Sequence, residues 1–454
     1  MRLKSFRGGA HPPGMKELSG GKPIQYHQAK GEMVFPLSQH IGKPAIPVVK
    51  RNDPVLAGQV IAKADGFISA NVISSCSGKV KSIEARMTSA GVIGQCIVID
   101  NDGAYTLAGG VGEPCDYTKL SPAEIVEKVR SAGVVGLGGS GFPTHVKLSP
   151  PDPEEIDYII ANGAECEPYI TCDDRLMQEQ TGWVIGGLKV LLHMFGNARA
   201  VIAIENNKPQ AIAAMEKAVA GEDRMEVMVL KTKYPQGSER NLVHAVTGRK
   251  MASADFPYNL GFIVDNVTTL AAIYRAVCLN EPLMEKGFTV TGDAVAQPGN
   301  FLVKIGTSFA EILEAAGGLK TQPKKVIIGG PMMGIAATDL NVPIAKSYNG
   351  LVCLTEDPVE KADAQMTHCI RCGRCQRACP VGLVPQMLNL YAERKDYEHY
   401  VKLSGLDCLA CGTCAFVCPA KRPLTQLFKM TKAVIEGQRA AQGFTETEKE
   451  ALTV

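Results

Sequence analysis

Eight of the fifteen cysteines fall into two runs of identical spacing. The first run is Cys369, Cys372, Cys375 and Cys379 before Pro380, and the second is Cys408, Cys411, Cys414 and Cys418 before Pro419. Thiolates at this spacing bind 4Fe–4S clusters, and the last cysteine of each run ligates the cluster of the other run. The spacing therefore predicts one cluster on Cys369, Cys372, Cys375 and Cys418, and a second on Cys408, Cys411, Cys414 and Cys379. The chemistry of such clusters is transfer of single electrons.

A pair of zinc knuckles or a disulfide framework is the alternative interpretation of the same cysteines. Zinc sites usually stop at two or four ligands and lack the trailing Cys-Pro pair. The other seven cysteines also suit a reducing compartment, where disulfides are rare. The iron–sulfur interpretation is therefore preferred.

The bulk properties agree with a soluble cytoplasmic redox protein. The 454 residues carry 48 basic and 46 acidic side chains, a net charge of +2, so no nucleic-acid partner is expected. No apolar run follows the charged N-terminus, which argues against a secretory signal. The longest apolar candidate, 183–195, is interrupted by Lys189 and His193 and is too short to span a bilayer.

The first hundred residues predict a strap and a β domain. Residues 1–30 are rich in glycine and proline and should form an extended strap. Residues 31–101 read as short strands, expected at Val48-Val49, Val55 to Ile61, Ile68, Val72-Ile73, Val80 to Ile83 and Cys96 to Ile99. The pattern resembles a lipoyl-type barrel sandwich. The tip that would carry a modified lysine, Asp65-Gly66-Phe67, has none, so we expect a scaffold.

The rest of the chain predicts a multi-domain α/β protein. Residues 118–285 alternate short apolar runs (156–161, 200–204, 225–230) with helical stretches (122–132 after the N-cap Ser121, 175–195, 208–220), which is typical of a parallel sheet. Residues 286–345 resemble a β-grasp unit of the SLBB type, with a helix over 308–316. Residues 360–430 should form a mostly helical ferredoxin-like domain holding both clusters, and residues 431–454 a tail.

A glycine-rich loop, Val135 to Lys147, is the second chemical signal. Four of its glycines stand within six positions, so backbone N–H groups can approach a phosphate closely, with Lys147 as a nearby positive charge. The loop matches neither the Rossmann nor the P-loop pattern, and an ordinary turn is the alternative.

The surrounding residues favour a cofactor site. Gly139-Ser-Gly-Phe-Pro-Thr144, Asn162-Gly-Ala-Glu-Cys-Glu-Pro168, Tyr234-Pro-Gln-Gly-Ser-Glu239 and Val264-Asp-Asn-Val-Thr-Thr269 follow one another in order. Together they resemble the FMN- and NADH-binding 51 kDa subunit of respiratory complex I over roughly residues 120–320. Ala164, Ser238 and Asp265 depart from that pattern.

The resemblance implies a set of cofactor-binding residues and no catalytic side chain. The glycines would contact FMN or the nucleotide through their backbones, Phe142 would stack near the nucleotide, and Lys147 would contact phosphate. Carboxylates at 167 and 239 would accept hydrogen bonds from the nucleotide, as ribose hydroxyls require. The implied set is Gly136, Gly138, Gly139, Gly141, Phe142, Lys147, Asn162, Glu165, Glu167, Tyr234, Gly237, Glu239, Asp265, Asn266 and Thr269.

Three further features resemble the C subunits of Rnf electron transport complexes almost end to end. They are Phe6-Arg-Gly-Gly-Ala-His-Pro-Pro-Gly-Met-Lys16, Gly329-Gly-Pro-Met-Met-Gly334 and the doubled cysteine motif. Membership would imply two 4Fe–4S clusters, FMN and NAD(H), with hydride exchange at the flavin and one-electron transfer through the clusters. It would also imply a peripheral position on the cytoplasmic face of the membrane, partner subunits, and ferredoxin reached through one of them.

Two other functions stay open at this point. Corrinoid reductases share the glycine-rich loop and the paired clusters, but in them the loop comes close to the N-terminus, whereas here about 130 residues precede it. A ferredoxin-like relay with a vestigial flavin fold is the second alternative. Flavin absorbance and its bleaching by NADH would separate these possibilities.

Overall fold

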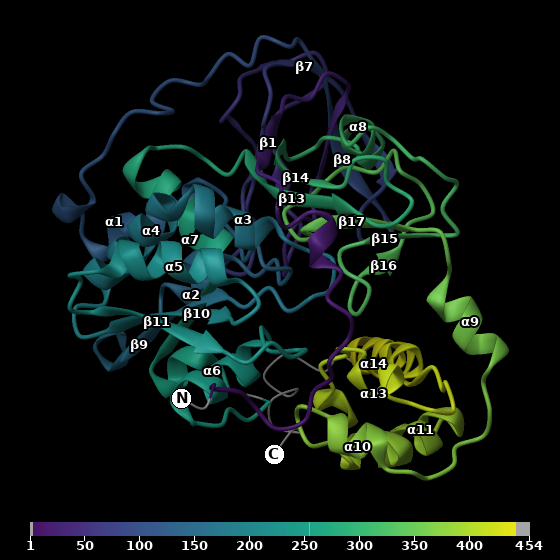
Figure 1. Ribbon diagram of the computed structural model, residues 1–454. Coiled ribbons are helices and arrows are strands. Elements are labelled where there is room, and N and C mark those ends of the chain that lie inside the picture. Colours follow the sequence, from purple (N-terminus) through teal and green to yellow (C-terminus); the bar gives the residue numbers. More distant parts are fainter. Residues whose placement is uncertain (1–2, 254, 442–454) are drawn as a thin grey trace. The chain divides into compact units, whose positions relative to one another are not determined.

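The computed structural model describes residues 3–253 and 255–441 (Figure 1). Its chain divides into two compact units. The first unit combines residues 1–13, 230–256 and 357–454, and the second combines residues 14–229 and 257–356. Each unit is therefore built from segments far apart in the sequence.

A four-stranded sheet of order β11-β10-β9-β12 forms the centre of the α/β part of the second unit. β9 pairs in parallel with both β10 and β12. The strands are β9 (Tyr158–Gly163), β10 (Arg199–Glu205), β11 (Met225–Leu230) and β12 (Phe262–Asn266). β9 connects to β10 on one side and lies against β12 on the other, so the topology reverses between β9 and β12. Ligands of open α/β sheets bind at the carboxyl ends of strands at such a point.

Helices cover this sheet and close its core (Figure 1). They are α1 (Pro122–Ser131), α2 (Thr144–Lys147), α3 (Cys172–Glu179), α4 (Thr181–Met194), α5 (Pro209–Val219) and α7 (Val267–Cys278). The prediction of Ser121 as an N-cap is confirmed by a full capping box with Glu124. α4 and α7 pack together, and Leu188, Leu191 and Leu270 are fully or almost fully buried between helices and sheet. Each such side chain stabilises the fold by about 1.5–3 kcal/mol.

The barrel-sandwich part consists of two small sheets, β2-β8-β7-β4 and β3-β5-β6. Their strands are β2 (Met33–Pro36), β3 (Ile46–Pro47), β4 (Pro54–Val55), β5 (Val60–Lys63), β6 (Val72–Ile73), β7 (Gly78–Met87) and β8 (Ile93–Asn101). The single strand expected from 55 to 61 is divided, because Gly58 turns the chain at a φ of +91°. The strand expected at Val48-Val49 lies two residues earlier.

The strand expected at Ile68 is wrong. Ile68 lies in the loop between β5 and β6, where its side chain is 37% exposed. Its carbonyl accepts a hydrogen bond from the Lys43 amide of another loop, not from a neighbouring strand. A lone β-branched residue between turn residues lacks the cross-strand partners that stabilise a sheet.

The remaining sheet of the second unit has the order β1-β14-β13-β17-β15-β16. Its strands are β1 (Ile24–His27), β13 (Glu285–Thr291), β14 (Gly299–Lys304), β15 (Lys325–Ile328), β16 (Ile335–Ala336) and β17 (Gly350–Leu354), and α8 (Phe309–Ala315) packs against it. β1 belongs to the predicted strap and pairs in parallel with β14. Part of the strap is therefore an edge strand.

The first unit is mainly helical, as predicted for the cysteine domain. Its helices are α6 (Glu239–Thr247), α9 (Pro358–Ala364), α10 (Arg374–Ala378), α11 (Pro385–Glu393), α12 (Tyr397–Lys402), α13 (Thr413–Phe416) and α14 (Leu424–Ala441). Leu388, Tyr400 and Phe428 form the centre of its core. The tail expected from residue 431 begins inside α14, and its residues 442–454 lie outside the described residues. Among the described residues, no helix is long and apolar enough to cross a membrane.

Candidate redox centres

The glycine-rich loop forms a tight hairpin between α1 and α2. Val135 and Pro143 face each other as an antiparallel bridge, and the Gly136 amide donates to the carbonyl of Phe142 at 2.8 Å. Gly139 and Gly141 have φ values of +108° and +63°, which favour glycine. The loop tip, 138–140, is exposed and Phe142 is half-buried. The tip therefore offers backbone rather than side chains to a ligand.

This hairpin lies on the carboxyl ends of β9 and β12. The Leu137 amide donates to Oγ1 of Thr269 at 2.9 Å. A Cβ at Gly138 would stand 2.9 Å from the Cβ of Asn266. Asn266 ends β12, directly opposite Asn162 of β9. The structure thus brings Gly138, Asn162, Asn266 and Thr269 together at the point where the sheet topology reverses.

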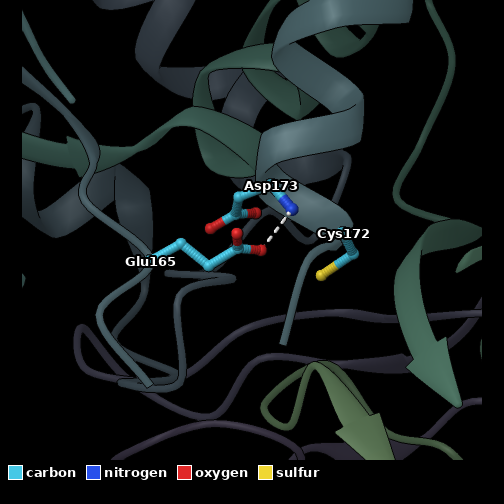
Figure 2. Close-up of side chains that lie close together, drawn as sticks. All are labelled: Glu165, Cys172 and Asp173. Atoms are coloured by element: carbon cyan, nitrogen blue, oxygen red, sulfur yellow. Dashed lines mark hydrogen bonds between the residues drawn. The ribbon is translucent and has the colours of Figure 1, made fainter. Parts of the chain in front are cut away.

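Glu165 lies beside the same edge, in the loop after β9. Its Oε1 atom accepts a hydrogen bond from the Asp173 amide at the start of α3, at 2.7 Å (Figure 2). The Asp173 carboxylate accepts from Nδ2 of Asn266 at 2.6 Å and from Oγ1 of Thr268 at 2.7 Å. Asp173 therefore ties the loop of Glu165 to the N-terminus of α7.

Lys16 holds this loop from the other side. Its ammonium donates to the backbone carbonyls of Glu165, Glu167 and Ile170 at 2.9, 3.1 and 2.5 Å. It also lies 3.8 Å from the Glu165 carboxylate. Lys208 donates to the carbonyl of Ala164 at 2.6 Å. Sequence reasoning missed Lys16, Asp173 and Lys208, because their partners lie far away in the chain: backbone carbonyls for the two lysines, and the Asn266 and Thr268 side chains for Asp173.

Burial controls the charge of this carboxylate cluster. Desolvation raises the pKa of Glu165 to about 8, while the charge of Lys16 opposes the rise. Burial also raises the pKa of Asp173 and of the neighbouring Cys172 thiol. Ligand atoms of Glu165, Cys172 and Asp173 all lie within 4.8 Å of one another (Figure 2). The lysine and the hydrogen bonds to Asp173 already satisfy most of these oxygens, so the trio is a framework of the loop.

Two charged residues of the implied set lie at the end of β12. The Lys147 ammonium donates to the Val264 carbonyl at 2.8 Å and stands 4.0 Å from Oδ1 of Asp265. Asp265 is 2% exposed. Lys147 is therefore oriented by the strand end below the hairpin, with a fifth of its side chain exposed.

Glu167 contacts the β-grasp part. Its Oε1 atom accepts hydrogen bonds from the amides of Met332 and Met333 at 2.8 and 2.9 Å. A Cβ at Gly330 would overlap the Glu167 side chain. The Gly329-to-Gly334 motif singled out in the sequence is thus the backbone cradle of this carboxylate.

The barrel sandwich supports the glycine-rich hairpin, as a scaffold would. The Ile41 amide donates to the Gly141 carbonyl at 3.0 Å. Nε2 of His145 lies 3.1 Å from the carbonyl of Phe67, at the tip that lacks a lysine. Both contacts fix the hairpin from the side of its second strand.

The remaining residues of the implied set, Tyr234, Gly237 and Glu239, belong to the first unit. Tyr234 is 2% exposed and donates from its hydroxyl to the backbone carbonyl of Cys411 at 2.7 Å. Gly237 lies in the turn before α6, and Glu239 is the first residue of that helix. Tyr234 is therefore attached to a cysteine loop.

The N-terminal segment forms backbone hydrogen bonds with Tyr234 and with the first cysteine run. The amides of Ala10 and Tyr234 donate to each other's carbonyls at 2.8 and 2.9 Å, and the Gly9 amide donates to the Ala378 carbonyl at 2.8 Å. At Gly8, with a φ of +81°, a Cβ would stand 2.7 Å from the carbonyl oxygen of Cys379. Only glycine permits this close approach.

Two cavities in the first unit are lined by four cysteines each. Cys379, Cys408, Cys411 and Cys414 line one of them, together with apolar residues that include Leu388 and Phe428. Cys369, Cys372, Cys375 and Cys418 line the other, together with polar residues that include Arg371 and Gln386. Each cavity thus takes three cysteines from one run and the last cysteine from the other. Four thiols around one space suit a cubane cluster.

The sheet edge beside the glycine-rich hairpin has features that suit a flavin. The hairpin tip presents bare backbone beside Asn266, where a side chain on Gly138 would fill the space. Oε2 of Glu165 is buried and makes no hydrogen bond among the described residues. Buried polar atoms normally have a partner, so a polar ligand would satisfy this one.

Family models match four parts of the chain. Residues 4–104 match the RnfC barrel sandwich hybrid domain, 129–275 the Nuo51 FMN-binding domain, 288–336 the SLBB domain, and 368–421 a 4Fe–4S dicluster domain. The fold and its sites therefore define a flavin and iron–sulfur electron-transfer protein, with FMN and two 4Fe–4S clusters as cofactors.

Relatives that match the chain over nearly its full length identify the family within this class of protein. The chain is 42% identical to the C subunit of the proton-translocating ferredoxin:NAD(+) oxidoreductase complex of Clostridium ljungdahlii, covering 95% of this chain and 94% of the relative. It is 38% identical to the C subunit of the Na(+)-translocating complex of Acetobacterium woodii, covering 96% and 98%. The chain belongs to the family of Rnf complex C subunits.

Proposed function

We propose that this chain is the NAD(H)-reacting, peripheral subunit of an ion-translocating ferredoxin:NAD(+) oxidoreductase. Its partners are the other subunits of a membrane-bound complex on the cytoplasmic face, and ferredoxin is reached through one of them. The near full-length similarity to the C subunits of two such complexes carries the proposal.

Bound FMN supplies the conversion between two-electron exchange with NAD(H) and one-electron exchange with iron–sulfur clusters. The exposed backbone of Gly138 and Gly139 is suited to hold the cofactors' phosphates and rings, while Gly136 and Gly141 shape the hairpin beneath it. Asn162, Glu165, Asn266 and Thr269 surround the flavin in this proposal, with Asp265 orienting Lys147 toward phosphate. The protein's task is to stack the rings and tune them by hydrogen bonds, so no acid or base is required.

The nucleotide lies against Phe142, Glu167 and Glu239 in this proposal, and Gly237 adjoins the flavin. The Met332 and Met333 amides hold Oε1 of Glu167 in place, and a carboxylate is the group that would accept a hydrogen bond from a ribose hydroxyl. The cysteine sets that line the two cavities ligate the two clusters, in the crossed arrangement that the spacing predicts. Within the first unit, the Tyr234 hydroxyl holds the loop of the cluster cysteine Cys411.

Anaerobic purification followed by iron, sulfide and flavin determination and an NADH titration tests the proposal. The expected result is full iron and sulfide, bound FMN, and bleaching of the flavin by NADH. Full clusters with no flavin uptake and no response to NADH would reduce the protein to an electron relay. Bleaching by NADH together with rapid reduction of a corrinoid would favour the corrinoid reductase alternative.

A further inference from the structure

The two cysteine loops share one backbone conformation but differ in their side chains. Arg371 and Ala410 stand at matching positions, with φ values of +54° and +51°. The following glycines, Gly373 and Gly412, have φ values of +70° and +85°. The loops are therefore structural equivalents, so a side chain found on only one of them is not required to shape a cluster loop.

Three arginines occur only on the first loop. When Cys369 is aligned with Cys408, Arg371, Arg374 and Arg377 correspond to an alanine, a buried threonine and a phenylalanine. All three arginines are exposed. No acidic residue occurs between Asp363 and Glu393, so this stretch of chain supplies no counter-charge of its own.

The first cavity is also the more accessible one. Cys369 and Cys372 are exposed, and Ile370 between them is 65% exposed. In the second loop Cys411 is buried and the residue that matches Ile370 is half-buried. One cluster site therefore has two exposed cysteines beside an exposed apolar side chain, whereas the other, called the enclosed site below, has one buried and three half-buried cysteines.

Compensation of cluster charge does not explain the arginines. A cluster with four thiolates is an anion, and the enclosed site would need nearby positive charge more, because low dielectric strengthens charge interactions. That site has Ala410, Thr413 and Phe416 at the three positions instead. Among the described residues, Arg371 and Arg374 take part in no hydrogen bond or ion pair. Arg377 only donates to the Cys372 carbonyl, at 3.3 Å.

We propose that Ile370, Arg371, Arg374 and Arg377, the arginine rim, form the docking surface for an acidic protein domain with a one-electron redox centre. An exposed apolar side chain on a loop that carries exposed charges of one sign suits a transient electron-transfer contact, because the charges steer encounter and fix orientation. One electron passes between the cluster at the Cys369 cavity and the partner's centre, so one is oxidised as the other is reduced. This inference rests on the proposed cluster assignment.

The test compares a charge-reversed rim with a matched control in the full-length, cluster-loaded protein. Arg371→Glu/Arg374→Glu reverses the two unpaired arginines, and Lys395→Glu/Lys402→Glu makes the same charge change at exposed positions outside the ligand loops. The probes are an acidic two-cluster ferredoxin, the basic protein cytochrome c, and phosphatidylglycerol–phosphatidylcholine vesicles. Binding is measured at about 50 mM and about 500 mM salt.

The rim variant should bind the acidic ferredoxin roughly tenfold more weakly at low salt, and the difference should vanish at high salt, where charges are screened. After reduction by dithionite, its electron transfer to that ferredoxin should slow by about tenfold, while transfer to cytochrome c should not slow. Dithionite reduces the clusters without flavin or nucleotide. A negative result in this experiment therefore counts against the docking surface and not against the proposed function.

Equal binding by wild type and rim variant, or equal weakening in the control, would overturn the proposal. So would rim-dependent binding to anionic vesicles with no affinity for the ferredoxin, since the rim would then be a membrane contact. If the rim variant loses iron, Arg371→Gln/Arg374→Gln replaces it, with an expected weakening of a few-fold.

Discussion

The hydroxyl of Tyr234 donates a 2.7 Å hydrogen bond to the backbone carbonyl of Cys411. Tyr234 lies within the part of the chain that matches an FMN-binding domain, and Cys411 within the part that matches a dicluster domain. The bond is buried away from water, so the hydroxyl and the carbonyl each need the other as their hydrogen-bond partner.

Tyr234→Phe should weaken the attachment of the Cys411 loop while keeping the aromatic ring in place. The Cys411 carbonyl would be left buried without its donor, at a cost of about 1–3 kcal/mol. We expect loss of one cluster to an iron chelator to accelerate by a factor of roughly 5 to 150. The measurement is the decay of cluster absorbance in anaerobic protein. Tyr391→Phe, a half-buried tyrosine that stacks on His399, should leave the decay unchanged. Equal decay in Tyr234→Phe and wild type would contradict the role of the bond.

Glu167 should separate nucleotide affinity from flavin binding. Glu167→Ala removes both the charge and the acceptor of the Met332 and Met333 amides, so NADH should bind about tenfold more weakly, a loss of about 1.4 kcal/mol. Glu167→Gln keeps an oxygen for those amides and should be less affected. NADH titration of flavin absorbance gives the affinity, and flavin content should stay at the wild-type level. An unchanged NADH affinity in the alanine variant would place the nucleotide elsewhere.

Cys372→Ala should remove one cluster and keep the other. Roughly half the iron and half the cluster absorbance should remain, because the four thiols around the enclosed cavity are untouched. Cys353→Ala is the control, since Cys353 is a buried cysteine of β17 outside both runs. Its variant should retain all iron. Full iron in Cys372→Ala would refute the ligand assignment.

His40 should make the barrel sandwich sensitive to acid. Burial, followed by the charge of Lys346, lowers the pKa of His40 to about 4 from 6.5. The folded state therefore holds His40 neutral while the unfolded chain takes up a proton, so the stability it contributes is present above pH 6.5. That contribution, at most about 3 kcal/mol, is lost as the pH falls from 6.5 toward 4.

Hydrogen exchange in residues 33–101 at pH 5 and pH 7.5, corrected for intrinsic rates, measures this effect. Wild type should lose protection at pH 5, whereas His40→Gln should show a smaller difference between the two pH values. The glutamine can still contact the Lys43 carbonyl and the Ser69 hydroxyl, which lie 2.9 and 3.1 Å from Nε2 of His40. An identical pH dependence in both proteins would exclude the histidine as the cause.

Local sequence signals predicted helices and strands well where a residue type favours one structure for a single physical reason. Ser121 begins α1 through a capping box, and the apolar runs became parallel strands. Ile68 failed, because its β propensity had no partner strand to act on. Strand preference depends on neighbours that a short window does not contain.

The implied cofactor residues could be identified only by resemblance, and their supports not at all. Lys16 and Asp173 hold the Glu165 loop through backbone carbonyls and an amide from about 150 and 8 residues away. Tyr234, which the resemblance implies as a cofactor-binding residue, also bonds to a cysteine loop that no sequence pattern connects to it. Such contacts leave no periodicity or spacing in the sequence, because they depend on how distant segments meet.

The backbone contacts made by Gly8 and Gly9 have a consequence for the order of biosynthesis. These residues are translated long before their contacts, the carbonyls of Ala378 and Cys379, which lie far later in the sequence. The bonds between Ala10 and Tyr234 can form earlier, but those of Gly8 and Gly9 must wait until Ala378 and Cys379 have been added. Closure of the first unit, and with it the enclosed cluster pocket, becomes a late event in the life of each newly made molecule.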